Sequence, residues 1–537
     1  MFKSCLFLVV VFLCMNGSFA LAAEKEIRGV WVTRFEWTSE DPEICKENIR
    51  EIFSSLGESN FNTALFQVRG SAETLYPSTL EPWSRLLGEK DPGFDPMQMA
   101  IDEARKNGVA IHAYINPMPL RETRWTEPPK DPKHIYHSHG PNSPDSWLCV
   151  DANGTPNTSE YYYMSAGIPE VQAYLRTVIM DLVRRYDLDG IHLDRIRYPG
   201  PEYSHDPVSK SRFRGRGNPN KLEWSDWQRE QLDKFINDLA AEIRAEKPNV
   251  LLSCSAWGIY NRYHLDGYWN FSSGYHDYYQ DTWNWCRLGA MDFLVPMIYW
   301  NMPEPKPNYD ELVKDFVKGV GGDHLVGGQR IFSATENANQ ITFTREAGAL
   351  GTVMFSHSSA RRRGIMDACK ETLYQEKAEV PTFKRVTEPE SGTILGTVTA
   401  EDGKPLVDAW VTLRASEGSR GRRFGGGSRT WTSGADGRFA FLNVMPGNAQ
   451  VRVSYPGASE ILSETLEIKA GAVTKIDITV PDAKTVREEP FIDILSPSDG
   501  LETTDSVIHL LGRTSPDCHV TVMDSTVEVY STGAFAR

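Results

Sequence analysis

The sequence predicts an α/β protein, a TIM (β/α)8 barrel followed by all-β sandwich domains. Strand-like and helix-like patterns alternate between residues 27 and 375, the order typical of parallel strands with crossover helices. Eight such units fill this stretch, and eight is the number that closes such a barrel. The alternative is a doubly wound open sheet, which is disfavoured because no glycine-rich nucleotide loop follows any predicted strand.

The predicted elements follow from hydrophobic periodicity. Short apolar runs predict strands at residues 28–35, 63–70, 109–116, 190–196, 250–257, 293–300, 325–332 and 352–358. Apolar residues at helical spacing predict helices at 45–56, 97–106, 171–186 and 227–245. Asn107-Gly108 and Leu288-Gly289 are helix stops. Parallel strands in this order bring their carboxyl ends to one face, where such barrels place catalytic groups.

The start of the chain predicts export. Lys3 precedes an apolar run, and Ala20-Leu21-Ala22 has the small residues of a cleavage site, so residues 1–22 are predicted to be a signal peptide. The apolar run is too short for a stable spanning helix, and no later segment has transmembrane length. We therefore expect a protein of the periplasm, the cell surface or the extracellular space, with no integral membrane segment after signal cleavage.

The composition changes after the barrel, which spans residues 27–375. Residues 376–391 are charged and contain prolines, which predicts a linker. Alternating apolar residues between turn signals predict a small β-sandwich at 392–482. Residues 490–537 begin a partial Ig-like β module that stops where another strand is needed, so we expect a truncated chain.

The net charge and the motifs limit the partners and the catalytic groups that the chain can have. The net charge of −15 argues against nucleic acid as partner, and also against a polyanionic substrate unless a local basic groove overrides it. The chain has no P-loop, zinc-protease motif or serine-nucleophile signature. A loop with His134, His137 and His139 has no acid at ligand spacing, so we expect no metal and no cofactor. Carboxylates therefore remain as the default catalytic groups.

The run from Asp189 to Pro199 gives the first candidate. Side chains alternate across a strand, so Gly190, His192 and Asp194 share one face, and Asp194 lies at the carboxyl end. A capping or ion-paired acid is an equally weighted interpretation of this position by itself. Glycosidic hydrolysis needs two carboxyl groups. The candidates for the second are Glu73, just past the second strand, and Asp281, in the run Tyr279-Gln280-Asp281-Thr282-Trp283.

Polar or aromatic residues also share faces on other strands, which is costly unless they serve a site. The candidate substrate-binding residues are Gln67, Arg69, His112, Tyr114, Asn116, His192, Arg197, Tyr198, Trp257, Tyr299 and Trp300. We expect His112, Asn116 and Trp257 to lie with Asp194 at one mouth of the barrel. Long loops rich in Trp and Tyr follow the second to fifth strands, so we expect an open groove for a polymer.

Several segments resemble a known family. They include Arg28-Gly29-Val30-Trp31, Gln67-Val68-Arg69, Leu75-Tyr76-Pro77-Ser78, His112-Ala113-Tyr114-Ile115-Asn116-Pro117, the run 189–199 and Val295-Pro296-Met297-Ile298-Tyr299-Trp300. In this order they are similar to the glycosyl-hydrolase-like 10 family. The resemblance implies a TIM barrel and carbohydrate hydrolysis outside the cytoplasm, with peptide-free peptidoglycan glycan strands as the substrate of some relatives.

The resemblance does not identify the residue that acts as the catalytic acid. The pattern from Gly190 to Asp194 is also similar to the nucleophile strand of the alpha-amylase clan, but the fifth strand has no Glu to match that clan's acid. Ile196 stands where a chitinase-type motif would have its Glu. Residues 393–480 resemble carboxypeptidase-regulatory-like sandwiches, which implies an accessory role. Two functions therefore remain: a secreted glycoside hydrolase acting on a polysaccharide, and a non-catalytic glycan-binding scaffold at the cell surface.

Overall fold

The computed structural model describes residues 25–156, 159–302, 305–415, 429–483 and parts of 492–537. The signal peptide predicted at residues 1–22 lies outside the described residues. Among the residues that are described, no helix has both the length and the apolar character needed to cross a membrane.

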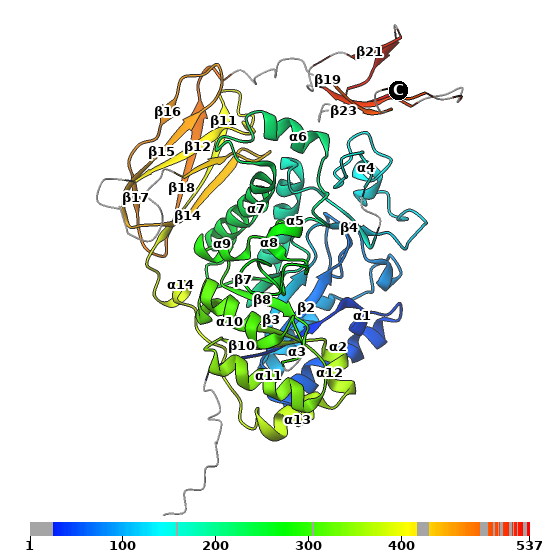
Figure 1. Ribbon diagram of the computed structural model, residues 1–537, viewed down its shortest axis with the longest axis vertical. Coiled ribbons are helices and arrows are strands. Elements are labelled where there is room, and N and C mark those ends of the chain that lie inside the picture. The colour runs from blue at the N-terminus through cyan, green and yellow to red at the C-terminus, as the bar shows by residue number, and fades with distance from the viewer. Residues whose placement is uncertain are drawn as a thin grey trace, which may run out of the picture.

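A closed barrel of eight parallel strands forms the centre of the molecule, which confirms the predicted fold class (Figure 1). The order around the barrel is β1-β10-β9-β8-β7-β6-β3-β2. The strands are β1 (Ile27–Val32), β2 (Thr63–Arg69), β3 (Ala110–Ile115), β6 (Gly190–Leu193), β7 (Leu251–Trp257), β8 (Phe293–Ile298), β9 (Gly327–Arg330) and β10 (Gly351–Phe355). A separate hairpin of β4 (Pro119–Glu122) and β5 (Tyr161–Tyr163) follows the third barrel strand.

Helices cover the outside of the barrel. The longer ones are α2 (Pro42–Glu58), α3 (Pro96–Asn107), α5 (Pro169–Arg185), α7 (Trp224–Glu246), α10 (Tyr309–Val320) and α11 (Ala334–Glu346). The shorter ones are α1 (Arg34–Trp37), α4 (Tyr136–His139), α6 (Pro207–Arg214), α8 (Gly274–Asp277), α9 (Thr282–Arg287), α12 (His357–Arg362), α13 (Ile365–Thr372) and α14 (Lys384–Thr387).

Local sequence explains where helices start and stop. The Asp95 carboxylate accepts the backbone N–H groups of Met97 and Gln98 at 3.0 and 3.1 Å, and Pro96 follows it at the first helical position of α3. The same helix ends at Gly108, whose φ of +68° suits a residue without a Cβ. The helix stop predicted at Asn107-Gly108 is therefore present in the structure.

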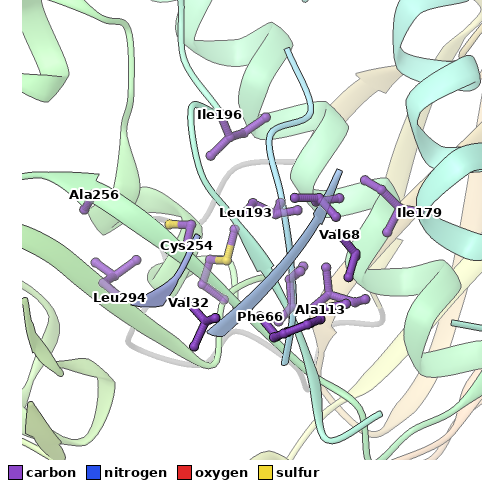
Figure 2. Packing of buried hydrophobic residues seen from close by; sticks show 14 of the residues in the cluster. Val32, Phe66, Val68, Ala113, Ile179, Leu193, Ile196, Cys254, Ala256 and Leu294 are labelled. Carbon is purple, nitrogen blue, oxygen red and sulfur yellow. The ribbon is translucent and has the colours of Figure 1, made fainter. Parts of the chain in front are cut away.

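The alternation of side chains along each strand builds two cores. Residues such as Val32, Phe66, Ala113 and Leu193 point outward and pack under the helices (Figure 2). A second cluster fills the inside of the barrel, with Ile27, Trp31, Leu65, Tyr114, Leu251, Phe293, Val295, Val326 and Val353. A polar residue on the inner face is thus surrounded by protein, except at the two open ends.

The first β-sandwich follows the barrel and lies against its helices (Figure 1). One sheet has the order β14-β11-β18 and the other β13-β12-β15-β16, with β17 paired to β15. Its strands are β11 (Gly392–Ala400), β12 (Trp410–Ala415), β13 (Thr430–Thr432), β14 (Arg438–Val444), β15 (Gly447–Ser454), β16 (Ile461–Leu462), β17 (Leu466–Ile468) and β18 (Val473–Val480). Beyond it, β19 (Ile492–Ser496), β20 (Leu511–Thr514) and β23 (Ala534–Ala536) form a small sheet beside the hairpin of β21 (Val520–Val522) and β22 (Ser525–Val527).

Charged and polar contacts fix the sandwich to the barrel. Arg212 of α6 donates to both carboxylate oxygens of Asp408, at 2.9 and 2.6 Å. The buried Asn237 of α7 donates to the carbonyl oxygen of Ala440 at 2.9 Å. Arg176 of α5, 1% exposed, donates to Asp436 at 2.6 Å. The outer face of the barrel at α5–α7 is therefore an interface, not a free surface.

The segment predicted as a linker, residues 376–391, also packs on the barrel. Phe383 is 9% exposed and stacks on Phe293 inside the barrel, with ring centroids 5.7 Å apart. Arg385 forms an ion pair with Asp292 at 2.6 Å, at the amino-terminal end of β8. The predicted linker therefore contacts the barrel through the buried Phe383 ring and the Arg385–Asp292 ion pair.

Candidate active site at the mouth of the barrel

Asp194 is the residue that follows β6, at the carboxyl-terminal mouth of the barrel. The hydroxyl of Tyr114, from the neighbouring strand β3, donates to Oδ2 at 2.8 Å. The backbone N–H of Arg195 donates to Oδ1 at 2.7 Å, and Nη1 of Arg197 lies 3.9 Å from Oδ1. The side chain of Asp194 keeps 14% of its surface exposed, so a ligand can still reach it.

The surroundings of Asp194 favour its ionised form. Burial raises the pKa of this carboxyl, but the guanidinium groups of Arg195 and Arg197 and the donated hydrogen bonds outweigh burial and hold the pKa below its ordinary value. An ionised carboxylate can act as a nucleophile or a base, whereas a catalytic acid must keep its proton. Asp194 therefore has the protonation state for the first two roles.

His192 lies one layer deeper and is completely buried. Its Nε2 accepts the indole N–H of Trp31 at 3.1 Å, so Nδ1 carries the proton and donates to the Ser253 hydroxyl at 3.0 Å. Burial lowers the pKa of His192 to about 3, so the imidazole is neutral. The ring supports Tyr114, with centroids 5.7 Å apart. These contacts make His192 a support for Tyr114, and at neutral pH its neutral ring carries no second proton to give to a substrate.

His112 lies lower still. It pairs in register with Gly190, two residues before His192, and burial lowers its pKa to about 4. The acids that act on it are Asp189 and Asp292, at the amino-terminal ends of their strands. The structure thus places His112 in the lower layer of the barrel interior and not at the mouth, because it lies one inward-facing position before Tyr114 on β3.

Three other predicted residues are tied into the framework. The side-chain oxygen of Gln67 accepts the backbone N–H of Arg34 at 3.0 Å. Arg69 is fully buried and donates hydrogen bonds to the Glu81 carboxylate from Nε and Nη2, at 2.8 and 2.6 Å. Its Nη1 donates to the carbonyl oxygen of Asn116, which is 1% exposed. A register irregularity at the end of β2 turns Arg69 to these partners, so it anchors the loops after β2 and β3.

Aromatic side chains flank the candidate carboxylate. Trp257 packs on Tyr278 with ring centroids 4.2 Å apart, and the Arg197 guanidinium lies 5.4 Å from the centre of the Trp257 ring. Tyr299 faces Phe355 at 5.9 Å, and burial and the charge of Asp194 raise its pKa. These contacts place Trp257, Tyr299 and Arg197 with Asp194 at the mouth.

The remaining two predicted aromatics support these residues. Tyr198 is 1% exposed and packs edge-on against Tyr279 at 5.3 Å, so it belongs to the loop core. Trp300 is partly buried, and its carbonyl oxygen accepts a hydrogen bond from Gln340 at 3.1 Å.

The two predicted partner acids have different surroundings. Glu73 accepts hydrogen bonds from the Ser84 hydroxyl at 2.9 Å and from the backbone N–H of Arg85 at 3.1 Å. Burial raises the pKa of Glu73, although the charge of Arg85 opposes this. Asp281 instead caps α9 by accepting the backbone N–H of Asn284 at 3.2 Å, and also accepts the Tyr260 hydroxyl at 2.6 Å. The surroundings of Glu73 therefore favour a retained proton.

A row of side chains connects Glu73 with Asp194. Glu73 and Arg34 line one cavity, and Arg34 donates to the Tyr161 hydroxyl at 3.3 Å. The guanidinium of Arg195 lies over the Tyr161 ring at 4.6 Å, and its backbone holds Asp194. The two carboxyl groups are thus on the same face of the barrel, on either side of this row.

Exposed aromatic rings occur at the ends of the strands and on the segments that follow them. They are Phe35, Trp125, Tyr263, Trp269 and Phe355, each at least 38% exposed. Flat rings suit the apolar faces of sugars, whereas the hydroxyl rims of sugars suit polar side chains.

The sequence patterns did not predict the β4–β5 hairpin. This hairpin supplies Arg121, Glu122 and Tyr161, all less than 10% exposed, and Glu122 pairs with Arg34 at 2.6 Å. Arg195 is extended toward the same hairpin and forms an ion pair with Glu160 at 2.7 Å. The segments Pro119–Glu122 and Tyr161–Tyr163 are each too short to identify a strand on their own.

Among the described residues there is no cluster of three or more His, Cys, Asp or Glu side chains that could hold a metal ion.

The fold and the site define a class: a TIM-barrel protein with an ionised carboxylate at its carboxyl-terminal mouth and exposed aromatic rings around it. A family model described as Glycosyl hydrolase-like 10 matches residues 26–325, more than half of the chain, and the chain belongs to this family. A second model, the carboxypeptidase regulatory-like domain, matches residues 393–481.

Two curated relatives are similar over most of their length. The chain is 26% identical over 415 residues to Glycosyl hydrolase YngK of Bacillus subtilis (strain 168), covering 70% of this chain and 79% of that protein. It is 28% identical over 327 residues to Glycosyl hydrolase DigH of Escherichia coli (strain K12), covering 54% and 70%. The glycoside hydrolase domain of PgaB (BpsB) from Bordetella bronchiseptica shares the fold, with a TM-score of 0.50, 14% identity and coverage of 66% and 100%.

Proposed function

We propose that this protein hydrolyses glycosidic bonds in a polysaccharide outside the cytoplasm, with Asp194 as the nucleophile or base. The observation that supports this most is the combination of position and charge at Asp194. It lies at the face where barrels of this kind place catalytic groups, and its pKa is lowered while its side chain stays partly exposed.

Glu73 is our candidate for the acid. Its raised pKa contrasts with the lowered pKa of Asp194, and such opposite shifts in two carboxyl groups of one site are typical of acid and base assignments. Asp281 is the weaker candidate because it caps a helix and accepts the Tyr260 hydroxyl. Export rests on the signal pattern in residues 1–22, and peptide-free peptidoglycan strands are the first polymer to test.

The test is product analysis on a panel of glycans that includes these strands. The wild-type chain should release shorter products, and Asp194→Asn should lower turnover by orders of magnitude because it keeps the shape and removes the charge. Asp189→Asn is the matched control, since Asp189 accepts the backbone N–H of Ile111 at 2.8 Å at the other end of the same strand. Turnover by Asp194→Asn near the wild-type rate contradicts the assignment.

The same experiment separates hydrolysis from the alternative function, a glycan-binding scaffold. A scaffold should bind a glycan of the panel without releasing products, and Asp194→Asn should then change only affinity. Binding by calorimetry and product release by chromatography, measured on the same glycan, distinguish the two functions.

A further inference from the structure

Two arginines follow Asp194 closely in the chain, and the fold gives them different partners. Arg195 is held by the segment around β5: its Nη1 and Nη2 donate to Glu160 at 2.8 and 2.7 Å, and its Nη1 also donates to the Tyr163 hydroxyl at 3.0 Å. Arg197 is 8% exposed, and its Nη1 is buried without a hydrogen-bond partner among the residues that the structure describes. The contacts of the protein itself therefore explain the first arginine but not the second.

The guanidinium of Arg197 lies at the mouth of the barrel beside the candidate carboxylate. Its Nη1 is 3.9 Å from Oδ1 of Asp194, close enough for electrostatic attraction but beyond the range of a hydrogen bond. Its Cζ lies 5.4 Å from the centre of the Trp257 ring and 5.6 Å from that of Tyr278. The indole N–H of Trp257 donates to the carbonyl oxygen of Ser272 at 2.9 Å, which fixes this ring. Aromatic rings thus hold the cation in place next to Asp194.

The neighbouring charges leave Arg197 with Asp194 as its counterion. Asp277, whose charge acts on one of these rings, pairs with Arg262 at 2.6 Å. His192, one layer below Asp194, is neutral because burial lowers its pKa to about 3. The pKa of Asp194 lies below its ordinary value. A carboxylate with a low pKa is a weak base but a good leaving group, which favours the nucleophile over the base among the two roles of Asp194.

A carboxylate nucleophile works in two steps. In the first, an oxygen of Asp194 bonds to the anomeric carbon, the bond from that carbon to the leaving oxygen breaks, and the acid, for which Glu73 is our candidate, gives that oxygen its proton. In the second, water attacks the anomeric carbon and gives a proton to Glu73, and the electron pair of the ester bond returns to the Asp194 carboxylate. The negative charge of Asp194 is therefore lost in the first step and restored in the second.

We propose that Arg197 acts in the second step, by stabilising the Asp194 carboxylate as it leaves the sugar. The inference deepens the proposed function and rests on it, because it makes Asp194 the nucleophile and Arg197 a positioning residue that acts through it. At an effective dielectric constant of about 20, with roughly half of the charge restored in the transition state, attraction across the 3.9 Å corresponds to about 30-fold in rate. The same cation opposes the first step, in which this charge is lost.

The first test is the stereochemistry of the products of the wild-type chain, on the glycan of the panel that it cleaves, beginning with peptide-free peptidoglycan strands. Two displacements at one carbon retain its configuration, whereas a single attack by water inverts it. Proton NMR of the first products should show retention. Inversion overturns the inference and leaves hydrolysis in place with Asp194 as the base. No product from any glycan refutes the proposed hydrolysis, and the inference with it.

The second test compares Arg197→Met with the wild type on the same glycan. Methionine keeps an apolar contact with the aromatic rings and removes the charge. Rapid-quench measurements should show a burst of one first product per chain, and mass spectrometry of the quenched chain should show the glycosyl ester. The decay of this ester should be about 30-fold slower than in the wild type. Arg197→Lys keeps a cation and should restore most of that rate, and Arg197→Gln is the second neutral variant in case Arg197→Met does not fold.

Arg229→Met is the matched control. Arg229 is also 8% exposed and lies over a tyrosine ring, that of Tyr275 at 4.0 Å, but it pairs with Asp226 at 2.6 Å. It should leave the ratio of the two steps unchanged, because a loss of folded chain lowers both rates equally.

Three results overturn the role of Arg197 while hydrolysis with retention stands. They are a neutral variant that shows neither burst nor ester, an equal fall in the rates of both steps, and an Arg197→Lys chain whose ester decays as slowly as that of the neutral variant. The failure of the inference and the failure of the proposed function are therefore distinguishable.

Discussion

Replacing Tyr114 with Phe tests the electrostatics of the candidate active site. The change removes the hydroxyl that donates to Oδ2 of Asp194 at 2.8 Å and keeps the ring that packs on His192. A hydrogen bond to a charged group contributes about 1.5–3 kcal/mol, and here it favours only the ionised form of Asp194. Its loss should therefore raise the pKa of Asp194 toward the ordinary range.

The sign of the effect on activity follows from that change. The pKa of Asp194 is lowered in the folded protein, so the active carboxylate is present above this pKa and is lost as the pH falls through it. Tyr114→Phe should move the acidic limb of the kcat/KM profile to higher pH. The assay is a pH series of initial rates on a cleaved glycan, with the fold checked by circular dichroism at each pH.

Tyr186→Phe is the matched control for this variant. Tyr186 also donates its hydroxyl to a carboxylate at 2.8 Å, but the acceptor is Asp95, the cap of α3. It should cost similar stability and leave the acidic limb in place. The reasoning is refuted if the acidic limb of Tyr114→Phe coincides with that of the wild type, or if Tyr186→Phe moves it equally.

Three further predictions concern stability and binding. The pKa of His192 is about 3 in the folded chain, so below pH 6.5 the unfolded chain binds this proton and the folded chain does not. His192 alone should therefore lower the free energy of unfolding by about 1.4 kcal/mol for each pH unit below 6.5. His192→Gln should reduce this dependence on pH in urea titrations. Arg212→Met leaves Asp408 without its partner in a largely buried ion pair and should lower the free energy of unfolding by about 3–5 kcal/mol. In calorimetry of the wild-type chain, the barrel and the sandwich should unfold in one transition, and two separated transitions would contradict a rigid interface. Trp269, 61% exposed on the loop after β7, should matter more as the glycan lengthens, because remote contacts help to orient the reacting sugar; equal losses for Trp269→Ala on short and long oligosaccharides would argue against an extended groove.

The sequence by itself determined the barrel and the position of Asp194. Both follow from short-range rules: apolar periodicity identifies strands and helices, and alternation along Gly190–Leu193 places His192 inside the barrel and Asp194 at its mouth. These rules involve neighbours in the chain, so they can be applied without knowing the fold. Alternation does not show how far along the barrel axis a residue lies. His112 was therefore expected at the mouth, whereas it lies in the lower layer of the barrel interior.

The tertiary structure decided which side chains share a site and which are only supports. Arg69 and Glu81 belong to one buried pair because a register irregularity at the end of β2 turns the arginine away from the mouth. Arg34 and Glu122 pair only because the β4–β5 hairpin lies beside the segment that follows β1. The packing of Phe383 under the barrel and of Asn237 against the sandwich likewise joins distant segments. Such contacts form only when the whole chain is folded. The pKa values of Asp194 and Glu73 also depend on the folded chain, because burial and nearby charges shift them through space. No local sequence pattern connects the residues involved.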